Sequence, residues 1–325
     1  MNFRVHLLGF VRNNEYFGPI TDGYTLFGYQ VNPRVAYQPA PNVVLEAGVF
    51  LKKDFGQERI TQLAPTLTIK FKHNRWNYLF GTLEGAVSHR LIEPLYNFER
   101  LLQQRLENGL QIHHQTEHTF FDFWISYLQN TLPGYTRQEQ FWGGFSLEQT
   151  ISKRDPDKHW ALSIPVQVTV FHAGGQNINT SLPVRTAVNA AGSLSLTWAN
   201  RLPGFFRSAR LDTYVVGYSE LAGKSDSGGA FYPNLTINLK PLTVLVSYWQ
   251  GTNYRAELGG YLYQNYTRRY NSVYQEKNRQ LLIVRFLKDI PIAGGLSVTA
   301  RFEPHYDLKN RLFEHSEGIY INFTH

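Results

Sequence analysis

The sequence predicts an all-β protein whose strands close into an antiparallel, up-and-down transmembrane β-barrel. Three features indicate this fold. Segments of about ten residues alternate between apolar and polar positions, as membrane strands do. The connections between segments are alternately short and long, and aromatic residues gather near the segment ends. Alternation with a period of two suits a strand that has lipid on one face and a polar lumen on the other, whereas a helix would scatter the same residues around its circumference.

The clearest alternating segment is 63–73. Its apolar positions are Pro65, Leu67, Ile69 and Phe71, and its polar positions are Thr66, Thr68, Lys70 and Lys72. The same pattern predicts sixteen strands, at 2–12, 24–37, 42–53, 63–73, 76–86, 105–115, 118–128, 138–152, 158–172, 183–200, 207–220, 230–240, 242–252, 278–288, 295–306 and 313–324. Because 76–86 and 105–115 alternate poorly, fourteen strands is the alternative.

The connections support a membrane barrel independently of the alternation. The short ones are 39–41, 73–75, 115–117, 154–157, 201–204, 240–241 and 291–294, and the long ones are 13–23, 54–62, 87–104, 129–137, 173–182, 221–229, 253–277 and 307–312. Outer-membrane barrels pair short periplasmic turns with longer external loops, and a soluble sandwich has no reason to do so. An even strand number predicts that both termini are periplasmic. The aromatic residues expected in the interfacial girdles are Tyr24, Tyr37, Trp76, Trp160, Trp198, Tyr248 and Phe323; in a soluble β protein they would be core.

Composition fits an exported single barrel over 1–325. The chain has no cysteine, one methionine, 20 tyrosines and 22 phenylalanines. Mean hydropathy is −0.33, and no apolar run approaches the roughly 20 residues of a membrane helix. The net charge of +7 comes from scattered Lys and Arg, so we expect contact with anionic lipid headgroups rather than nucleic acid. Because residues 1–4 lead directly into a strand pattern, we expect a chain whose leader has been removed.

The last strand carries the most specific motif. Residues 317–323 read Glu-Gly-Ile-Tyr-Ile-Asn-Phe, with Ile319, Ile321 and Phe323 on one face. This stretch resembles the β-signal of Gram-negative outer-membrane β-barrel proteins, in which Gly318, Ile321 and Phe323 hold the characteristic positions. The resemblance implies an integral outer-membrane protein that meets outer-membrane lipid and the barrel-assembly machinery. The chain departs from the pattern in the two residues that follow the aromatic.

The wider layout resembles porin-like barrels and, through 91–96 and 106–110, the large barrel families of Bacteroidota. In porins the third long loop folds inward and narrows the pore. By this resemblance, loop 87–104 would narrow the pore, with a helix opened by Glu93-Pro94 and with Glu93, Glu99, Arg100 and Arg105 near the constriction. The alternative is an external cap or a helix that docks another subunit.

Alternation also predicts which charges point into the lumen. They are Arg4, Arg34, Glu46, Lys70, Lys72, Asp122, Glu148, Arg185, Arg210, Asp212, Arg285, Arg301 and Glu303, with Glu107 as a further acidic position. In an open lumen the small basic surplus would favour anions. Alternatively, these charges pair across neighbouring strands and partly fill the lumen.

Candidates for chemistry are few. Ser88-His89 and His172 near Ser181 are loose serine–histidine pairs outside any recognised hydrolase motif. Of His113, His114 and His118, only the last two could converge, which leaves too few ligands for a metal site. We therefore expect no catalytic residues, no metal and no cofactor. Loop 253–277 is rich in Tyr and Arg, which favours either a partner or glycan surface or an extended external hairpin.

The function expected from the sequence is a passive channel for small polar or anionic solutes, and not an enzyme. One alternative is a non-conducting accessory subunit that holds other envelope proteins through loops 87–104 and 253–277. A second alternative is an outer-membrane lipid hydrolase.

Overall fold

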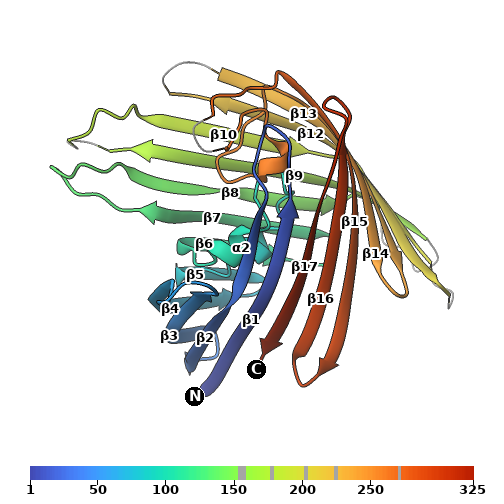
Figure 1. Ribbon diagram of the computed structural model, residues 1–325. Helices are drawn as coiled ribbons and strands as arrows, with labels where there is room; N and C mark the ends of the chain where they lie inside the picture. The colour runs from blue at the N-terminus through green and yellow to red at the C-terminus, as the bar shows by residue number, and fades with distance from the viewer. Residues whose placement is uncertain (153–158, 176–178, 201–203, 223–225, 270–271) are drawn as a thin grey trace.

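The computed structural model describes residues 1–152, 159–175, 179–200, 204–222, 226–269 and 272–325. Their strands form one sheet that closes on itself (Figure 1). The strands are β1 (Asn2–Glu15), β2 (Tyr24–Ala40), β3 (Val43–Asp54), β4 (Gln62–His73), β5 (Trp76–Thr82), β6 (Asn108–Gln115), β7 (Thr119–Gln129), β8 (Glu139–Thr150), β9 (Trp160–Gly174), β10 (Arg185–Gly192), β11 (Ser195–Ala199), β12 (Phe206–Glu220), β13 (Asp226–Leu239), β14 (Thr243–Thr252), β15 (Asn278–Ala293), β16 (Leu296–Asp307) and β17 (Leu312–Thr324).

The ring closes where β1 pairs antiparallel with both β2 and β17. The short segments β10 and β11 share the neighbours β9 and β12, so together they are one barrel strand interrupted at Ser193–Leu194. The described chain is therefore a closed 16-strand antiparallel barrel, as predicted, and the fourteen-strand alternative is wrong. The predicted bounds differ most at β15, which runs on to Ala293, at β5, which ends at Thr82, and at β13, which begins at Asp226.

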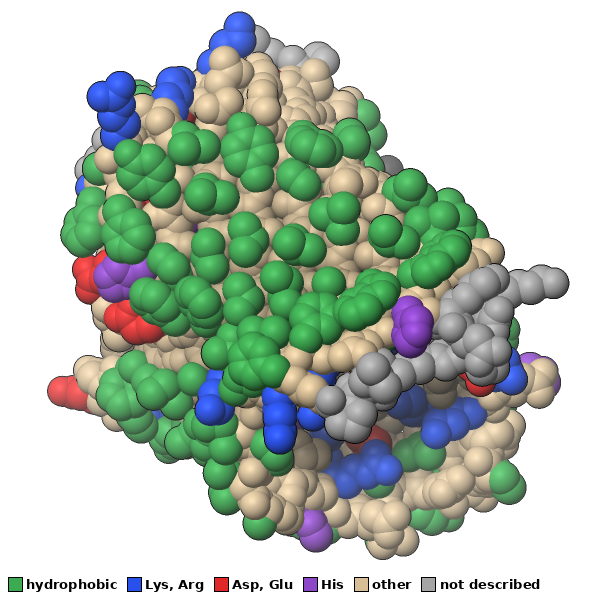
Figure 2. Space-filling view, turned by 90° about the vertical axis from the view of Figure 1, so that its right-hand side faces the viewer, with side chains coloured by type: hydrophobic (Ala, Val, Ile, Leu, Met, Phe, Trp, Pro, Cys, Tyr) green, Lys and Arg blue, Asp and Glu red, His purple; other side chains and the backbone are tan. Residues whose placement is uncertain are grey.

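The two faces of the wall have opposite chemistry. On β4, Leu67 is 53% exposed on the outside, whereas Thr66 and Thr68 are buried on the inside. Figure 2 shows the result as a broad band of apolar side chains over the wall. Such a band is stable only against hydrocarbon, and a closed ring leaves no unpaired strand edge there. No helix in the described residues is long and apolar enough to cross a membrane.

The third long loop folds into the lumen as a plug, residues 83–107. Of the two interpretations of this loop, the inward one is correct. The helix predicted from Glu93-Pro94 is wrong, because the plug contains only α1 (Ala86–His89) and α2 (Arg100–Gln103). Leu95 and Leu102 are each 1% exposed and belong to different apolar clusters of the barrel interior. The plug therefore runs as short turns across the lumen and contacts more than one part of the barrel wall.

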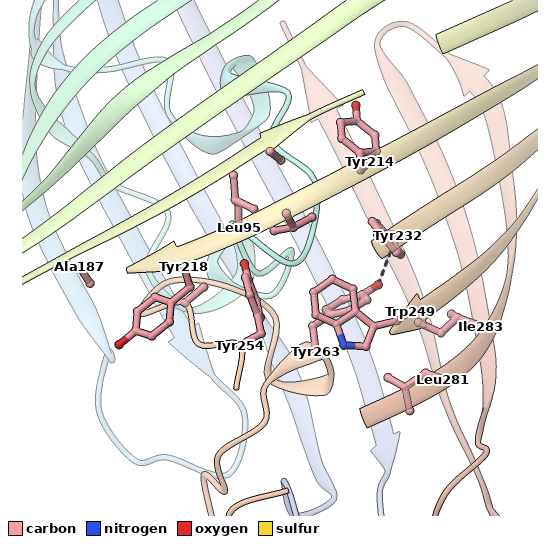
Figure 3. Close-up of a cluster of buried hydrophobic side chains, with 13 residues drawn as sticks. Leu95, Ala187, Tyr214, Tyr218, Tyr232, Trp249, Tyr254, Tyr263, Leu281 and Ile283 are labelled. Atoms are coloured by element: carbon pink, nitrogen blue, oxygen red, sulfur yellow. Dashed lines mark hydrogen bonds between the residues drawn. The ribbon is translucent and has the colours of Figure 1, made fainter. Parts of the chain in front are cut away.

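The loop 253–277 also enters the barrel, so the extended hairpin interpretation is wrong. Tyr254 and Tyr263 are buried beside Trp249, and Tyr263 lies in the short helix η1 (Tyr261–Tyr263). The Tyr263 hydroxyl lies 3.2 Å from that of Tyr232 on β13 (Figure 3). Wall, plug and this loop thus share one apolar cluster.

Candidate active site

Buried ion pairs tie the plug to the wall. Glu303 on β16 accepts from Arg12 at 3.0 Å, from Arg285 at 2.5 Å, and from Arg301. From the plug, Glu93 pairs with Arg285 and Arg301, and Glu99 accepts from Arg12 at 2.8 Å. Breaking one member of such a buried network leaves an uncompensated charge, which typically costs about 3–5 kcal/mol. The network therefore holds the plug in place.

Most of the other charges predicted in the lumen are also found with partners. Arg4 and Arg34 pair with Glu46, Lys70 with Glu84, Arg185 with Glu220, and Arg210 with Glu148 and Asp212. Lys72 is exposed near the end of β4. On the plug, the Arg100 guanidinium lies over the Tyr96 ring and Arg105 lies 3.4 Å from His6. A cavity of about 330 Å³ remains in the lumen beside Arg90, Arg210 and Arg285.

His89 is buried between two carboxylates. Its Nδ1 lies 2.5 Å from Asp122 and its Nε2 lies 3.1 Å from Glu107, while its ring stacks on Trp124 at 3.8 Å. Burial lowers the pKa of His89, but the hydrogen bonds to Asp122 and Glu107 outweigh burial and raise it above 6.5. With both nitrogens engaged, His89 fastens the plug, and neither nitrogen is left to act as a base toward a substrate.

The other histidine candidates do not converge on a recognisable site. His172 faces outward on β9, 2.9 Å from the Thr186 hydroxyl and stacked on Phe141. Ser181 is exposed between β9 and β10. His114 stacks on Trp76. Within the described ranges, no three His, Cys, Asp or Glu side chains gather as a metal ion would require.

A different cluster stands on the outer, lipid-facing side of the wall. Its members are Asn13 and Glu15 on β1, Thr25 on β2, and His315 and Glu317 on β17. The strand register places Thr25, Asn13 and Glu317 in one row across the three strands. Glu15 lies opposite His315, two residues farther along β1. These residues share the outward face with Val11, Ile319 and Ile321. We call them the outer cluster.

Hydrogen bonds join the outer cluster into one network. His315 Nδ1 lies 2.8 Å from Glu317 Oε2. The Asn13 amide donates to Glu317 at 3.1 Å and to Glu15 at 2.6 Å, and the Thr25 hydroxyl donates to Asn13 at 2.7 Å. The His315 and Glu317 side chains remain 33% and 45% exposed, so a lipid can reach them. At the margin of the apolar band, Figure 2 shows a histidine flanked by acidic side chains.

An apolar groove of about 410 Å³ begins at this cluster. Asn13 and Glu317 line one end, and Ile319, Ala300 and Phe302 continue it along the wall. The Phe302 ring lies 5.9 Å from the His315 ring, so it joins the groove to the histidine. The arrangement places a histidine–carboxylate pair at the mouth of a slot that suits a hydrocarbon chain.

The chemistry of this arrangement follows from the histidine. Because a carboxylate only accepts, Nδ1 of His315 must carry the proton, and Nε2 of the neutral ring is then basic. A carboxylate that orients a histidine is the usual arrangement for a general base. Charged residues on the lipid face cost about 0–1 kcal/mol near the interface but more at the midplane. The outer cluster lies near the long-loop ends of β1 and β17, away from the middle of the wall.

Comparison with known protein families gives a match over the whole chain. The family described as "Lipid A 3'-O-deacylase-type" matches residues 1–325. The chain belongs to this family. The expectation that the protein is not an enzyme is therefore wrong, because a deacylase-type family positively indicates one. A search of the curated proteins finds no match.

Solved structures show the same fold in outer-membrane barrels. OmpTdeltaL8, a loop deletion mutant of an outer membrane protein of Vibrio cholerae, is 11% identical, with a TM-score of 0.58 over 100% of this chain and 98% of that one. Pseudomonas aeruginosa OpdL is 11% identical, with a TM-score of 0.56 over 99% and 98%. OprD from the same organism is 9% identical, with a TM-score of 0.51 over 99% and 93%. The resemblance to outer-membrane β-barrel proteins that the sequence indicated is thereby confirmed.

None of the outer-cluster residues is among the candidates for chemistry that the sequence predicted. Those candidates are serine–histidine pairs, which lie elsewhere. The signal was present in β17, where the face that carries Ile319, Ile321 and Phe323 also carries His315 and Glu317. Two titratable residues at lipid-facing positions are a functional indication by default.

Proposed function

We propose that this protein hydrolyses an ester-linked acyl chain of a lipid A-type glycolipid, and that the outer cluster is its active site. The long loops face outward from the cell and both termini are periplasmic, so the cluster meets the outer leaflet. The observation that carries the proposal is the His315–Glu317 pair on the lipid face at the mouth of the apolar groove. The acyl chain lies in the groove, and its ester carbonyl reaches His315.

The reaction is a general-base hydrolysis. His315 Nε2 takes a proton from a water molecule, whose oxygen bonds to the ester carbonyl carbon. The tetrahedral intermediate collapses with cleavage of the bond between that carbon and the sugar oxygen, and the protonated His315 returns the proton to the sugar oxygen. The products are a carboxylic acid and a sugar hydroxyl. Glu317 orients the imidazole, and Asn13, which is itself held by the Thr25 hydroxyl, holds the Glu317 carboxylate in place.

The passive channel is the less supported function. Barrels of about 16 strands leave an aqueous channel when they are empty, but here the plug and loop 253–277 pack against the walls in shared apolar clusters. A catalytic site on the outer wall needs no open lumen. The filled lumen stabilises the wall that carries the site.

Product analysis tests the proposal. Purified protein in detergent micelles is incubated with lipid A that carries a 3'-O-linked acyl chain, and mass spectrometry follows the lipid. We expect loss of one acyl chain and one free fatty acid. Asn13→Ala at the outer cluster should slow the release, whereas Ser88→Ala in the plug should not. Intact substrate with folded wild-type protein, or loss of activity only in Ser88→Ala, would overturn the assignment.

A further inference from the structure

Two adjoining pockets lie at the long-loop end of the barrel, away from the outer cluster. The first, of about 460 Å³, is lined by side chains that include Arg185, Glu220 and Arg255. The second, of about 360 Å³, is lined by Arg255, Tyr266 and Arg268 among others. Arg255 and Tyr266 line both pockets, so the two adjoin. We call the pair, which lies over β10, β12 and loop 253–277, the depression.

The first pocket offers acceptors for hydroxyl groups. Glu220 is 9% exposed, and its Oε2 accepts a hydrogen bond from Arg185 at 3.2 Å. Its buried Oε1 has no hydrogen-bond donor among the described residues. A buried acceptor without a donor is costly unless a ligand supplies one. Asp226 also lines this pocket and accepts a hydrogen bond from the Tyr266 hydroxyl at 2.8 Å. Carboxylates in a pocket beside tyrosine rings suit a saccharide, whose hydroxyls donate and whose ring faces pack on aromatics.

The second pocket offers positive charge. The carboxylate contact of Arg255, to Glu257, is 3.6 Å long, which is too far for a hydrogen bond. Arg268 lies over the Tyr261 ring and donates to the Glu257 carbonyl at 3.3 Å. Guanidinium groups bind carboxylate or phosphate oxygens in a two-pronged manner. This end of the depression therefore suits an acidic substituent.

The depression is held in shape before any ligand arrives. Asn189 on β10 donates to the Arg255 carbonyl at 2.7 Å, and Gln264 donates to the Ala256 carbonyl at 2.9 Å. Asn265, which is fully buried, donates to the Glu276 carbonyl at 2.6 Å. Such side-chain bonds to backbone fix the loop, and a preformed site loses less entropy on binding.

We infer that this depression, with Glu220 at one end and Arg255 and Arg268 at the other, is a binding site for an acidic oligosaccharide. The site stands apart from ester hydrolysis, because it binds sugar rather than an acyl chain. Phosphate and carboxylate share the chemistry that the arginines recognise. The ligand is accordingly a saccharide that bears either group.

Titration calorimetry with the full-length protein in detergent tests this site. The probe is a fully deacylated, phosphorylated lipopolysaccharide core oligosaccharide, which has no ester for the outer cluster to cleave. We expect saturable binding that weakens about ten-fold or more in Arg255→Gln and in Glu220→Gln, the usual effect of losing a charged hydrogen bond. Arg59→Gln, on the exposed loop between β3 and β4, is the matched control and should bind as wild type does.

Further probes separate the outcomes. Weaker binding after dephosphorylation of the probe assigns the acidic group as phosphate, and equal binding of an oligogalacturonate assigns it as carboxylate; both support the site. Equal binding of neutral maltoheptaose, or of inorganic phosphate alone, would overturn it. An equal loss of affinity in Arg59→Gln would also overturn the site, as would the absence of binding by a protein that circular dichroism shows to be folded. Because no probe carries an acyl chain, these results do not depend on hydrolysis.

Discussion

The side chains of His315 and Glu317 leave the same face of β17, and His315 Nδ1 lies 2.8 Å from Glu317 Oε2. In the register, Glu317 stands opposite Asn13 and His315 stands opposite Glu15. The strand that closes the barrel therefore also brings the outer cluster together. The active site that we propose at this seam would let the enzyme act on a membrane lipid without admitting it to the lumen.

Removing the carboxylate behind His315 should slow turnover. In Glu317→Gln the neutral amide no longer holds the Nδ1 proton, so the wrong tautomer is populated and kcat should fall by about 10²-fold or more. Acyl release from lipid A micelles measures it. Glu139→Gln is the control, because Glu139 begins β8 on the same long-loop rim, and it should leave kcat unchanged. Equal rates in wild type and Glu317→Gln would remove Glu317 from the mechanism.

Filling the groove should change the preference for acyl-chain length more than it changes the rate of ester cleavage. Ala300 lines the groove, and phenylalanine there would occupy volume that an acyl chain needs. In Ala300→Phe we expect a raised KM for long-chain substrates and a smaller change for short ones. Ala47→Phe, on the exposed face of β3, adds the same volume elsewhere and should have no effect. An unchanged chain-length profile in Ala300→Phe would show that the groove does not hold the acyl chain.

The plug should keep the lumen closed to ions. Wild-type protein in planar bilayers should conduct far less than a variant in which residues 86–104 are replaced by a short glycine–serine linker, since a barrel of about 16 strands is wide enough for an aqueous channel. Single-channel recording measures both. Large, steady wild-type conductance would instead favour the passive channel.

Acidic conditions should strengthen the attachment of the plug. The pKa of His89 is raised above 6.5 in the folded protein, so its stabilising contribution is complete below about pH 6.5 and is lost as pH rises through the folded value. We expect the melting temperature, followed by tryptophan fluorescence, to fall with pH across that window in wild type. His89→Gln removes the titration and should show a flatter profile. Identical profiles would mean that His89 does not titrate with unfolding.

Much of the fold could be predicted because the alternation along each strand distinguishes its lipid-facing side from its lumen-facing side. Where Leu67 and Ile69 alternate with Thr66 and Thr68, the sequence alone indicates which face of β4 meets lipid. The plug could not be predicted in the same way. Its residues Leu95 and Leu102 look like one face of a helix, but they pack on different walls, and that depends on contacts far away in the chain.

The outer cluster could not be predicted from the sequence either, because it also depends on contacts between distant parts of the chain. Asn13, Thr25 and Glu317 are far apart in sequence and meet only because β1 pairs with both β2 and β17. Ser88 and His89, in contrast, are adjacent in sequence and attract attention as a pair, yet His89 is used to bind Asp122 and Glu107. Parity along β17 was the available clue, since it places His315 among lipid-facing residues.

The most direct test compares two outward-facing histidines. His315 is paired with a carboxylate, whereas His172, on β9, is paired with the Thr186 hydroxyl. Acyl release from lipid A is measured for His315→Ala and His172→Ala, both shown to be folded by circular dichroism. We expect His315→Ala to lose activity by about 10²-fold or more, the usual effect of removing a general base, and His172→Ala to keep it. Full activity in His315→Ala would contradict the placement of the active site on the outer wall.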